Sequence, residues 1–95
     1  MAVYVDAITD YGDTAREAGL RTTRWAHLTA DTREELHAFA ARIGLRRAWF
    51  QNAGNYRWHY DVTPGKRTAA LRAGAQPIDL TGLAALMARR RAAHT

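Results

Sequence analysis

The chain has 95 residues, of which 47% are hydrophobic and 24% are charged, with seven Gly, two Pro and no Cys. This length suits one domain with a modest core, and the composition excludes a disordered or collagen-like chain. The lack of Cys excludes a disulfide scaffold, a Cys-ligated zinc site, an iron–sulfur cluster and a thiol nucleophile. No apolar run approaches the ~20 residues of a membrane span, and the first residues lack the pattern of a secretion signal. We therefore expect a soluble, cytoplasmic protein with no membrane partner.

The net charge of +5 hides a division along the chain. Residues 1–35 carry four Arg against seven Asp or Glu, whereas residues 36–95 carry ten Lys or Arg against two Asp. A basic second part is typical of a protein with a polyanionic partner, such as nucleic acid or a phosphorylated ligand. The strong preference for Arg over Lys, together with many Ala residues, also fits a coding bias. Both explanations of the charge stay open.

The first third of the chain predicts two strands joined by a long polar connection. An alternating pattern predicts a strand near 2–6 and another near 24–29. Residues 7–23 between them are polar, and we expect at most one helical turn there, at 13–18. In the second strand, His27 shares a face with its neighbours two residues away, as the period of a strand requires.

A helix is predicted over 32–43. Asp31 and Glu34 have the spacing of a capping box at its start, and Gly44 is suited to its end. Apolar residues recur at the spacing of one buried helical stripe. The residues that we expect to be nearly fully buried, on this helix and on the strands, are Leu36, Phe39, Ile43, Val3, Val5 and Phe50.

The rest of the chain predicts a hairpin, two helices and a last strand. Alternation predicts strands near 47–51 and 56–62, close enough in sequence to pair with each other. A helix follows over 64–73, with Pro at its first position, and a short strand near 76–79 comes after it. Apolar residues at helical spacing predict a final helix over 81–95, which carries a run of Arg.

Strands that alternate with helices predict the α/β fold class. We expect a small single domain, with a mostly parallel or mixed sheet of about five strands flanked by helices. Residues 1–80 should form the α/β domain itself. Residues 81–95 should form an amphipathic basic helix that packs on the same domain. The oligomeric state does not follow from the sequence.

Several segments also carry a resemblance to a known family. They are WAHLTADT at 25–32, ELHAFAARIGL at 35–45, HYDVTPGKR at 59–67, AALRAGA at 69–75 and the initial VYVD at 3–6. With these segments the chain resembles a small bacterial and phage family catalogued as domain of unknown function 4031. The similarity extends from about Ala2 to Asp79, and the connection 7–23 is longer than the link typical of that family. The resemblance implies the domain and assigns no reaction.

The start of the second helix is a candidate anion site. Thr63, Gly65, Lys66 and Arg67 combine a hydroxyl, a glycine and two cations at a place where free backbone N–H groups point along the helix axis. Cations are unusual in the first turn of a helix, because the positive end of the helix dipole lies there. We expect this turn to hold an anion, with His59 and His27 nearby. The alternatives are that both cations point to solvent, or that Arg67 pairs with Asp61.

A scatter of His and Asp residues is a second candidate site. His37, His59 and Asp61 are candidates for acid–base catalysis, and Asp6 or Asp61 could hold a divalent metal. Their spacing matches no known metal-binding or catalytic motif, and hydrogen-bonded structural histidines are the more common explanation for such residues. We therefore assign no metal ligand and expect no cofactor.

The sequence favours a phosphate-binding domain that recognises nucleic acid or a nucleotide. One alternative is a phosphoesterase or nuclease that uses a metal or a His base. The other is a protein-interaction module without catalysis, in which the basic helix docks on an acidic partner. Whether the chain is an enzyme stays open at this point.

Overall fold

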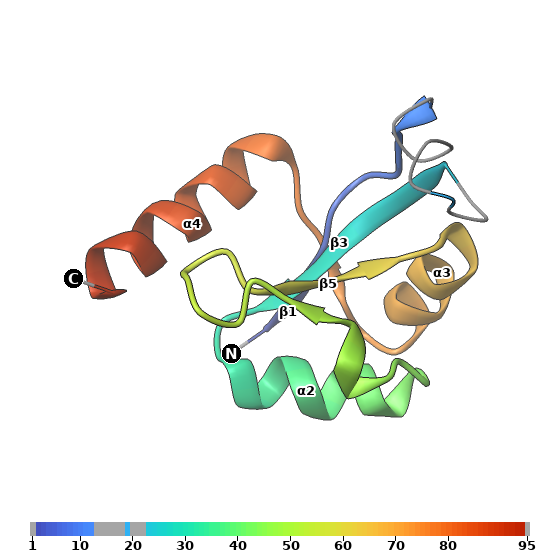
Figure 1. Ribbon diagram of the computed structural model, residues 1–95, viewed down its shortest axis with the longest axis horizontal. Coiled ribbons are helices and arrows are strands. Elements are labelled where there is room, and N and C mark those ends of the chain that lie inside the picture. Colours follow the sequence, from blue (N-terminus) through green and yellow to red (C-terminus); the bar gives the residue numbers. More distant parts are fainter. Residues whose placement is uncertain (1, 13–18, 20–22, 95) are drawn as a thin grey trace.

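The computed structural model describes residues 2–12, 19 and 23–94, and Figure 1 shows their arrangement. The strands are β1 (Val3–Val5), β2 (Thr9–Asp10), β3 (Arg24–Ala30), β4 (Phe50–Gln51), β5 (His59–Val62) and β6 (Gln76–Pro77). The helices are α2 (Arg33–Arg42), α3 (Pro64–Arg72) and α4 (Leu80–His94), with a short 3-10 helix at Arg47–Trp49. No described helix is long and apolar enough to cross a membrane.

The sheet is mixed, which confirms the expected α/β class. Its strands lie in the order β4-β5-β3-β1-β6, and β2 pairs with the outer end of β3. The pair β1–β6 is parallel, and the other pairs of described strands are antiparallel. β4 and β5 form the hairpin that the sequence predicted. The sheet has a sixth strand because Thr9 and Asp10, placed in a polar connection by the sequence, pair with Trp25 and Arg24.

Three predicted strands were too long. Of the strand predicted at 47–51, only Phe50 and Gln51 pair, because the residues before them turn in the 3-10 helix. Of the strand at 56–62, only His59–Val62 pairs, because Asn52 adopts a left-handed backbone with φ 57° and the chain turns before β5. The last predicted strand is limited to Gln76–Pro77. The helical turn expected at 13–18 lies outside the described residues.

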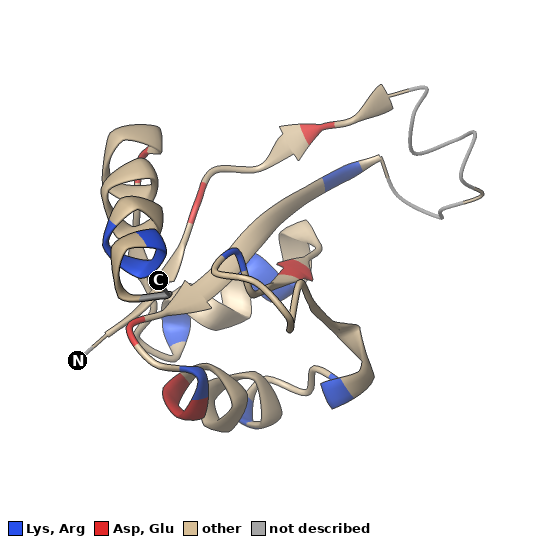
Figure 2. Cartoon of the chain, turned by 60° about the vertical axis from the view of Figure 1, so that its left-hand side comes forward, with Lys and Arg blue, Asp and Glu red and all other residues tan. Residues whose placement is uncertain are grey.

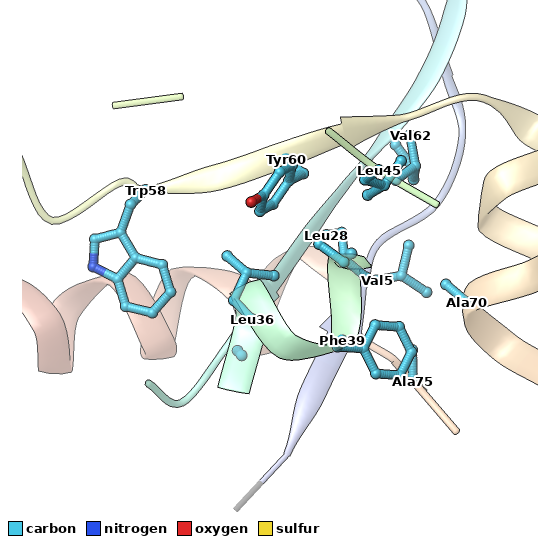
Figure 3. Packing of buried hydrophobic residues seen from close by; sticks show 13 residues of the cluster. Val5, Leu28, Leu36, Phe39, Leu45, Trp58, Tyr60, Val62, Ala70 and Ala75 are labelled. Atoms are coloured by element: carbon cyan, nitrogen blue, oxygen red, sulfur yellow. The ribbon is translucent and has the colours of Figure 1, made fainter. Parts of the chain in front are cut away.

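The sheet has a helix layer on each side. In Figure 1, α2 and α3 lie below the sheet and α4 lies above it. The main core is between the sheet and the lower pair (Figure 3), and its largest fully buried side chains include Tyr60, Leu28, Leu36, Val5 and Val62. Of the residues expected in the core, Val5, Leu36 and Phe39 are buried, as predicted.

Val3, Ile43 and Phe50 are only partly buried, so the expectation of nearly full burial was wrong for them. Each sits where the layers end. Val3 begins β1, Ile43 is the C-cap that follows α2, and Phe50 belongs to a two-residue strand at the edge of the sheet.

The N-terminus of α2 is capped one residue later than predicted. Thr32 is the N-cap: its Oγ1 accepts the Glu35 N–H at 3.2 Å and lies 3.0 Å from the Glu35 Oε1. Asp31 instead accepts the Ala2 N–H at 2.7 Å and the Tyr4 hydroxyl at 2.9 Å. Thr32 and Glu35 therefore occupy the capping positions, with the Glu35 carboxylate in contact with the Thr32 hydroxyl. Asp31 connects the start of β1 to the end of β3.

One arginine connects α4 to the sheet. The Arg90 guanidinium donates to the carbonyls of Tyr56, Trp58 and Ala30 and to the Thr29 hydroxyl. It also stacks on the Trp58 ring, with its central carbon 3.3 Å from the ring centre. Burial lowers the pKa of Arg90 to about 10, and the side chain stays charged at neutral pH. Leu86, one turn before it, is buried beside the sheet.

The buried stripe of α2 makes a test of the core. Phe39→Ala should lower the free energy of unfolding by ~3–5 kcal/mol, because it removes a 6% exposed ring and leaves a cavity between α2 and the sheet. Glu34→Ala, on the exposed side of the same helix, should change it by less than about 1 kcal/mol. Urea unfolding followed by circular dichroism measures both. Equal losses for the two variants would contradict this placement of the core.

Candidate functional site

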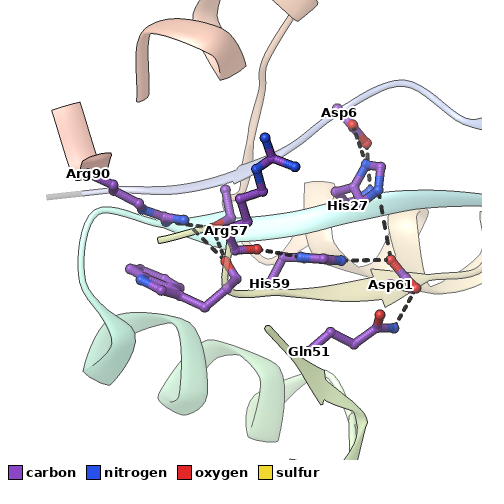
Figure 4. Close-up of polar contacts among 9 residues, drawn as sticks. Asp6, His27, Gln51, Arg57, His59, Asp61 and Arg90 are labelled. Atoms are coloured by element: carbon purple, nitrogen blue, oxygen red, sulfur yellow. Dashed lines mark hydrogen bonds and ion pairs between the residues drawn. The ribbon is translucent and has the colours of Figure 1, made fainter. Parts of the chain in front are cut away.

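Three neighbouring strands, β4, β5 and β3, and the residue that follows β1 place polar side chains in a row on the face of the sheet opposite the main core (Figure 4). Ala26 and Leu28 are buried in the core, so His27 between them points to the other face. The same alternation in β5 places His59 and Asp61 there, as the sequence predicted. His27 and Asp61 are direct cross-strand partners, which brings the three side chains together.

His27 is oriented by Asp6, which follows β1. One Asp6 carboxylate oxygen lies 2.7 Å from the His27 Nδ1, and the other accepts the His27 backbone N–H at 2.6 Å. The hydrogen bond to Asp6 raises the pKa of His27, and it outweighs the burial that lowers it. With Nδ1 bonded to Asp6, the free ring atom Nε2 faces the Asp61 Oδ1 at 3.9 Å.

His59 is oriented by a backbone carbonyl. Its Nδ1 lies 2.7 Å from the Arg57 oxygen, which can only accept a hydrogen bond, so Nδ1 carries a proton. The other ring atom, Nε2, lies 3.2 Å from the Asp61 Oδ1. In a neutral imidazole this Nε2 carries a lone pair, which faces the negatively charged carboxylate oxygen and is repelled by it. A proton or another cation between the two atoms removes this repulsion.

Asp61 directs its charge at the two imidazoles. Its Oδ2 accepts a hydrogen bond from the Gln51 amide of β4. Its Oδ1 is buried, and no well-formed hydrogen bond reaches it from the part of the chain that the structure describes. Burial alone would raise the pKa of Asp61, but the contacts with His59, Gln51 and His27 outweigh it and lower the pKa. Asp61 is therefore ionised at neutral pH.

These three side chains have the donor set of a metal site. One ligand atom from each of His27, His59 and Asp61 can be chosen so that all lie within 4.8 Å of one another. Two imidazoles and one carboxylate suit zinc and related transition metals. Asp6 and the Arg57 carbonyl bind the far nitrogen of each imidazole, which is how the ligands of metal sites are commonly oriented.

A pocket of about 190 Å³ borders this cluster. His27, Thr29 and His59 line it from the sheet, and Leu83 and Met87 line it from α4. The loop between β4 and β5 adds Asn52 and Arg57. The cluster therefore opens into a space with apolar side chains on one side and a cation on another.

The predicted anion site at Thr63–Arg67 uses its side chains within the fold. The Lys66 ammonium donates to the Ile43 carbonyl at 2.6 Å, and the Arg67 Nε donates to the Asp6 carbonyl at 2.8 Å. The Thr63 hydroxyl accepts the Lys66 backbone N–H at 3.3 Å. The two contacts differ from the alternatives considered from the sequence, which were solvent for both cations or an ion pair between Arg67 and the Asp61 carboxylate. Gly65 is exposed, and the binding of an anion at this turn stays a prediction.

His37 lies away from the other candidates. Its Nδ1 is 2.8 Å from the hydroxyl of Tyr60, whose side chain points into the core, and its ring packs edge-on against Phe50 at 4.5 Å. Burial, with the charges of Arg47 and Arg33, lowers the pKa of His37. The structure thus places His37 on the opposite face of the sheet from His59 and Asp61, where it cannot act on the same atoms.

Sequence reasoning did not find the residues that complete this site. Asp6 was considered as a metal ligand and not as the partner of His27, and Arg57 was not considered as part of a pocket. The sequence signal for Asp6 was its place directly after a strand. Leu83 and Met87 gave no signal, since apolar residues on a helix are expected in any core.

The comparison with known families identifies one match. A family described as "Protein of unknown function (DUF4031)" matches residues 3–90, which confirms the resemblance seen in the sequence. No curated protein and no solved structure shows a significant match.

The contact between Lys66 and Ile43 predicts a structural role for this lysine. Lys66→Gln should lower the free energy of unfolding by about 1–2 kcal/mol, because the ammonium satisfies a carbonyl at the C-terminus of α2, the negative end of its dipole. Arg46→Gln, at an exposed position, is the control and should have little effect. Thermal unfolding measures stability, and calorimetry with inorganic phosphate measures anion binding. Unchanged stability with lost phosphate binding would instead support the predicted anion site.

Proposed function

The chain belongs to the DUF4031 family, and we propose that it is a metal-dependent phosphoesterase whose ion is held by His27, His59 and Asp61. The observation that carries this proposal is the convergence of two imidazole Nε2 atoms on one carboxylate oxygen, at 3.2 and 3.9 Å. Hydrolysis of a phosphate ester was an alternative in the sequence analysis. The geometry of the cluster favours it over simple anion binding at α3.

Electrostatics supports an ion at this place. Asp6 and the Arg57 carbonyl bind the Nδ1 atoms, so in the neutral imidazoles the Nε2 lone pairs face the Asp61 carboxylate. Three electron-rich atoms that face one another are stabilised by a cation between them. Asp61 is ionised and its Oδ1 is without a well-formed hydrogen bond in the described part of the chain, as a metal ligand requires.

Three protein ligands suit catalysis better than a purely structural site, because they leave a coordination position for water. An ion held by His27, His59 and Asp61 would lower the pKa of a bound water and so supply a nucleophile at neutral pH. In the hydrolysis, the water oxygen forms a bond to phosphorus and the ester P–O bond breaks. One proton of the water ends on the leaving alcohol, and the other stays on the phosphate product or passes to solvent.

Arg57 supports a phosphate ester as the substrate. It is exposed at the pocket beside the cluster, and no described carboxylate lies within ion-pair distance of its guanidinium. A guanidinium binds phosphate oxygens through paired hydrogen bonds. The excess of Lys and Arg after residue 35 also favours an anionic ligand over a neutral one.

A second candidate function follows from the same contact. A proton on the His59 Nε2 would satisfy Asp61 without an ion, and the cluster would then be an imidazolium–carboxylate pair that binds a phosphate through Arg57. Such a protein would bind phosphate esters and leave them intact. Metal titration distinguishes the two candidates.

The test measures ion binding and hydrolysis in one set of variants. We expect the metal-free protein to bind one Zn²⁺ or Mn²⁺ by calorimetry, and to hydrolyse p-nitrophenyl phosphate only when the ion is present. His59→Gln and Asp61→Asn should weaken ion binding by about 100-fold or more, and Asp6→Asn by about 10–100-fold. His37→Gln, on the opposite face, should bind the ion like the parent.

Circular dichroism shows whether each variant is folded. A folded parent protein that binds none of these ions at micromolar concentration would refute the metal site. An ion that binds equally well to His59→Gln would place the site elsewhere. Hydrolysis that persists after removal of the ion with a chelator would refute the metal-dependent mechanism.

A further inference from the structure

The size and lining of the pocket beside the cluster restrict which substrates could bind there. On the basis of the proposed function, we infer that the substrate is a small phosphate monoester with an apolar organic group, rather than a nucleic-acid chain. The phosphate lies between the ion and Arg57, and the organic group packs on Leu83 and Met87 of α4. The size of the pocket, its two kinds of lining and the arrangement of the basic residues favour this substrate class.

The pocket is small and one side of it is apolar. Its volume of about 190 Å³ is below the ~300–1,000 Å³ of typical ligand sites, and an apolar cavity of about 150 Å³ is enough for one benzene ring. Leu83 and Met87, both partly buried, provide the apolar side. A thioether adapts to the shape of a flat ring. This space therefore suits a single ring or a short apolar chain.

The polar side of the pocket suits a terminal phosphate. Arg57 holds His59 through its carbonyl, so its side chain starts next to a ligand of the proposed ion, and Figure 4 shows it on the same side of the sheet as His27. Its guanidinium lies over the Tyr56 ring, 5.5 Å from the centre, which restricts its position. A terminal phosphate has three free oxygens to share between an ion and a guanidinium, whereas a diester has two.

The basic residues do not favour a long polyanion. Lys and Arg positions occur on α2, α3, α4 and the loops between elements, rather than along one element (Figure 2). The run Arg89–Arg91 provides fewer cations for an external ligand than its sequence indicates, because the Arg90 guanidinium donates to three carbonyls and a hydroxyl of the protein. α4 lies above one end of the sheet (Figure 1), and its Leu83 and Met87 border the pocket beside His27 and Arg57.

The experiment uses the full chain loaded with the ion that calorimetry identifies. Four substrates are compared: p-nitrophenyl phosphate, a pyrimidine 5′-mononucleotide, bis-p-nitrophenyl phosphate and a single-stranded DNA 12-mer. We expect kcat/KM for p-nitrophenyl phosphate, whose organic group is a single ring, to exceed that for the two-ring nucleotide, the diester and the 12-mer by tenfold or more.

Two variants test the two sides of the pocket. Arg57→Gln keeps the carbonyl that binds His59 and should raise KM for p-nitrophenyl phosphate by about tenfold or more, with unchanged ion affinity. Met87→Phe fills the apolar side and should raise KM for p-nitrophenyl phosphate more than for methyl phosphate. Arg46→Gln, an exposed arginine that does not line this pocket, is the matched control.

Each result supports or overturns a separate step. A protein that binds the ion and cleaves the nucleotide, the 12-mer or the diester as fast as p-nitrophenyl phosphate overturns this inference and leaves the phosphoesterase proposal standing. Unchanged kinetics in a folded Arg57→Gln variant overturns the role of Arg57. A parent protein that binds no ion, or binds it without hydrolysis of any of the four, overturns the proposed function and with it this inference.

Discussion

The pairing of β3 with β1 on one side and β5 on the other determines both the core and the candidate site. The register Val5 to Leu28 and Leu28 to Tyr60 places three large apolar side chains on one face. Because side chains alternate along a strand, the same register places His27 beside Asp61 on the other face. A slip of one residue would send the imidazole into the core and the apolar side chains to the pocket. The register of β3 with β5 therefore determines both the packing of the core and the arrangement of His27 and Asp61.

The local parts of this structure could be predicted from sequence, and the long-range parts could not. Alternation was enough to place His59 and Asp61 on one face, and the Thr63–Pro64 pair was enough to place the start of α3. The contact between Asp6 and His27 depends on the pairing of two strands 21 positions apart, and no pattern within either strand encodes it. The apolar side of the pocket comes from Leu83 and Met87 of α4, so it depends on which side of the sheet this helix packs. The apolar stripe of the helix does not specify that side.

The cations at the start of α3 show that tertiary contacts can outweigh the preference of a helix dipole for charge at each end. Lys66 and Arg67 occupy the first turn of α3, where the dipole disfavours cations. The sequence interpretation took this as the sign of a bound anion. In the fold the Lys66 ammonium reaches the C-terminus of α2, where a cation is favoured, and Arg67 reaches a carbonyl next to β1. Gly44 makes room for this contact: a Cβ there would stand 3.0 Å from the ammonium nitrogen. Lys66 and Arg67 thus connect α3 to the end of α2 and to the segment that follows β1.

The way α4 is held has a consequence for the order of folding. The acceptors of Arg90 belong to the end of β3 and to the turn before β5, so they come together only once those strands have paired. The helix is also the last described element of the chain and is the last of them to leave the ribosome. We therefore expect the docking of α4 through Arg90 to require the paired strands. The sheet can position His27, His59 and Asp61 before α4 arrives, but the pocket exists only when Leu83 and Met87 are in place. Ligand binding in that pocket would therefore report the completion of folding, whereas binding at the three side chains alone would report the earlier step.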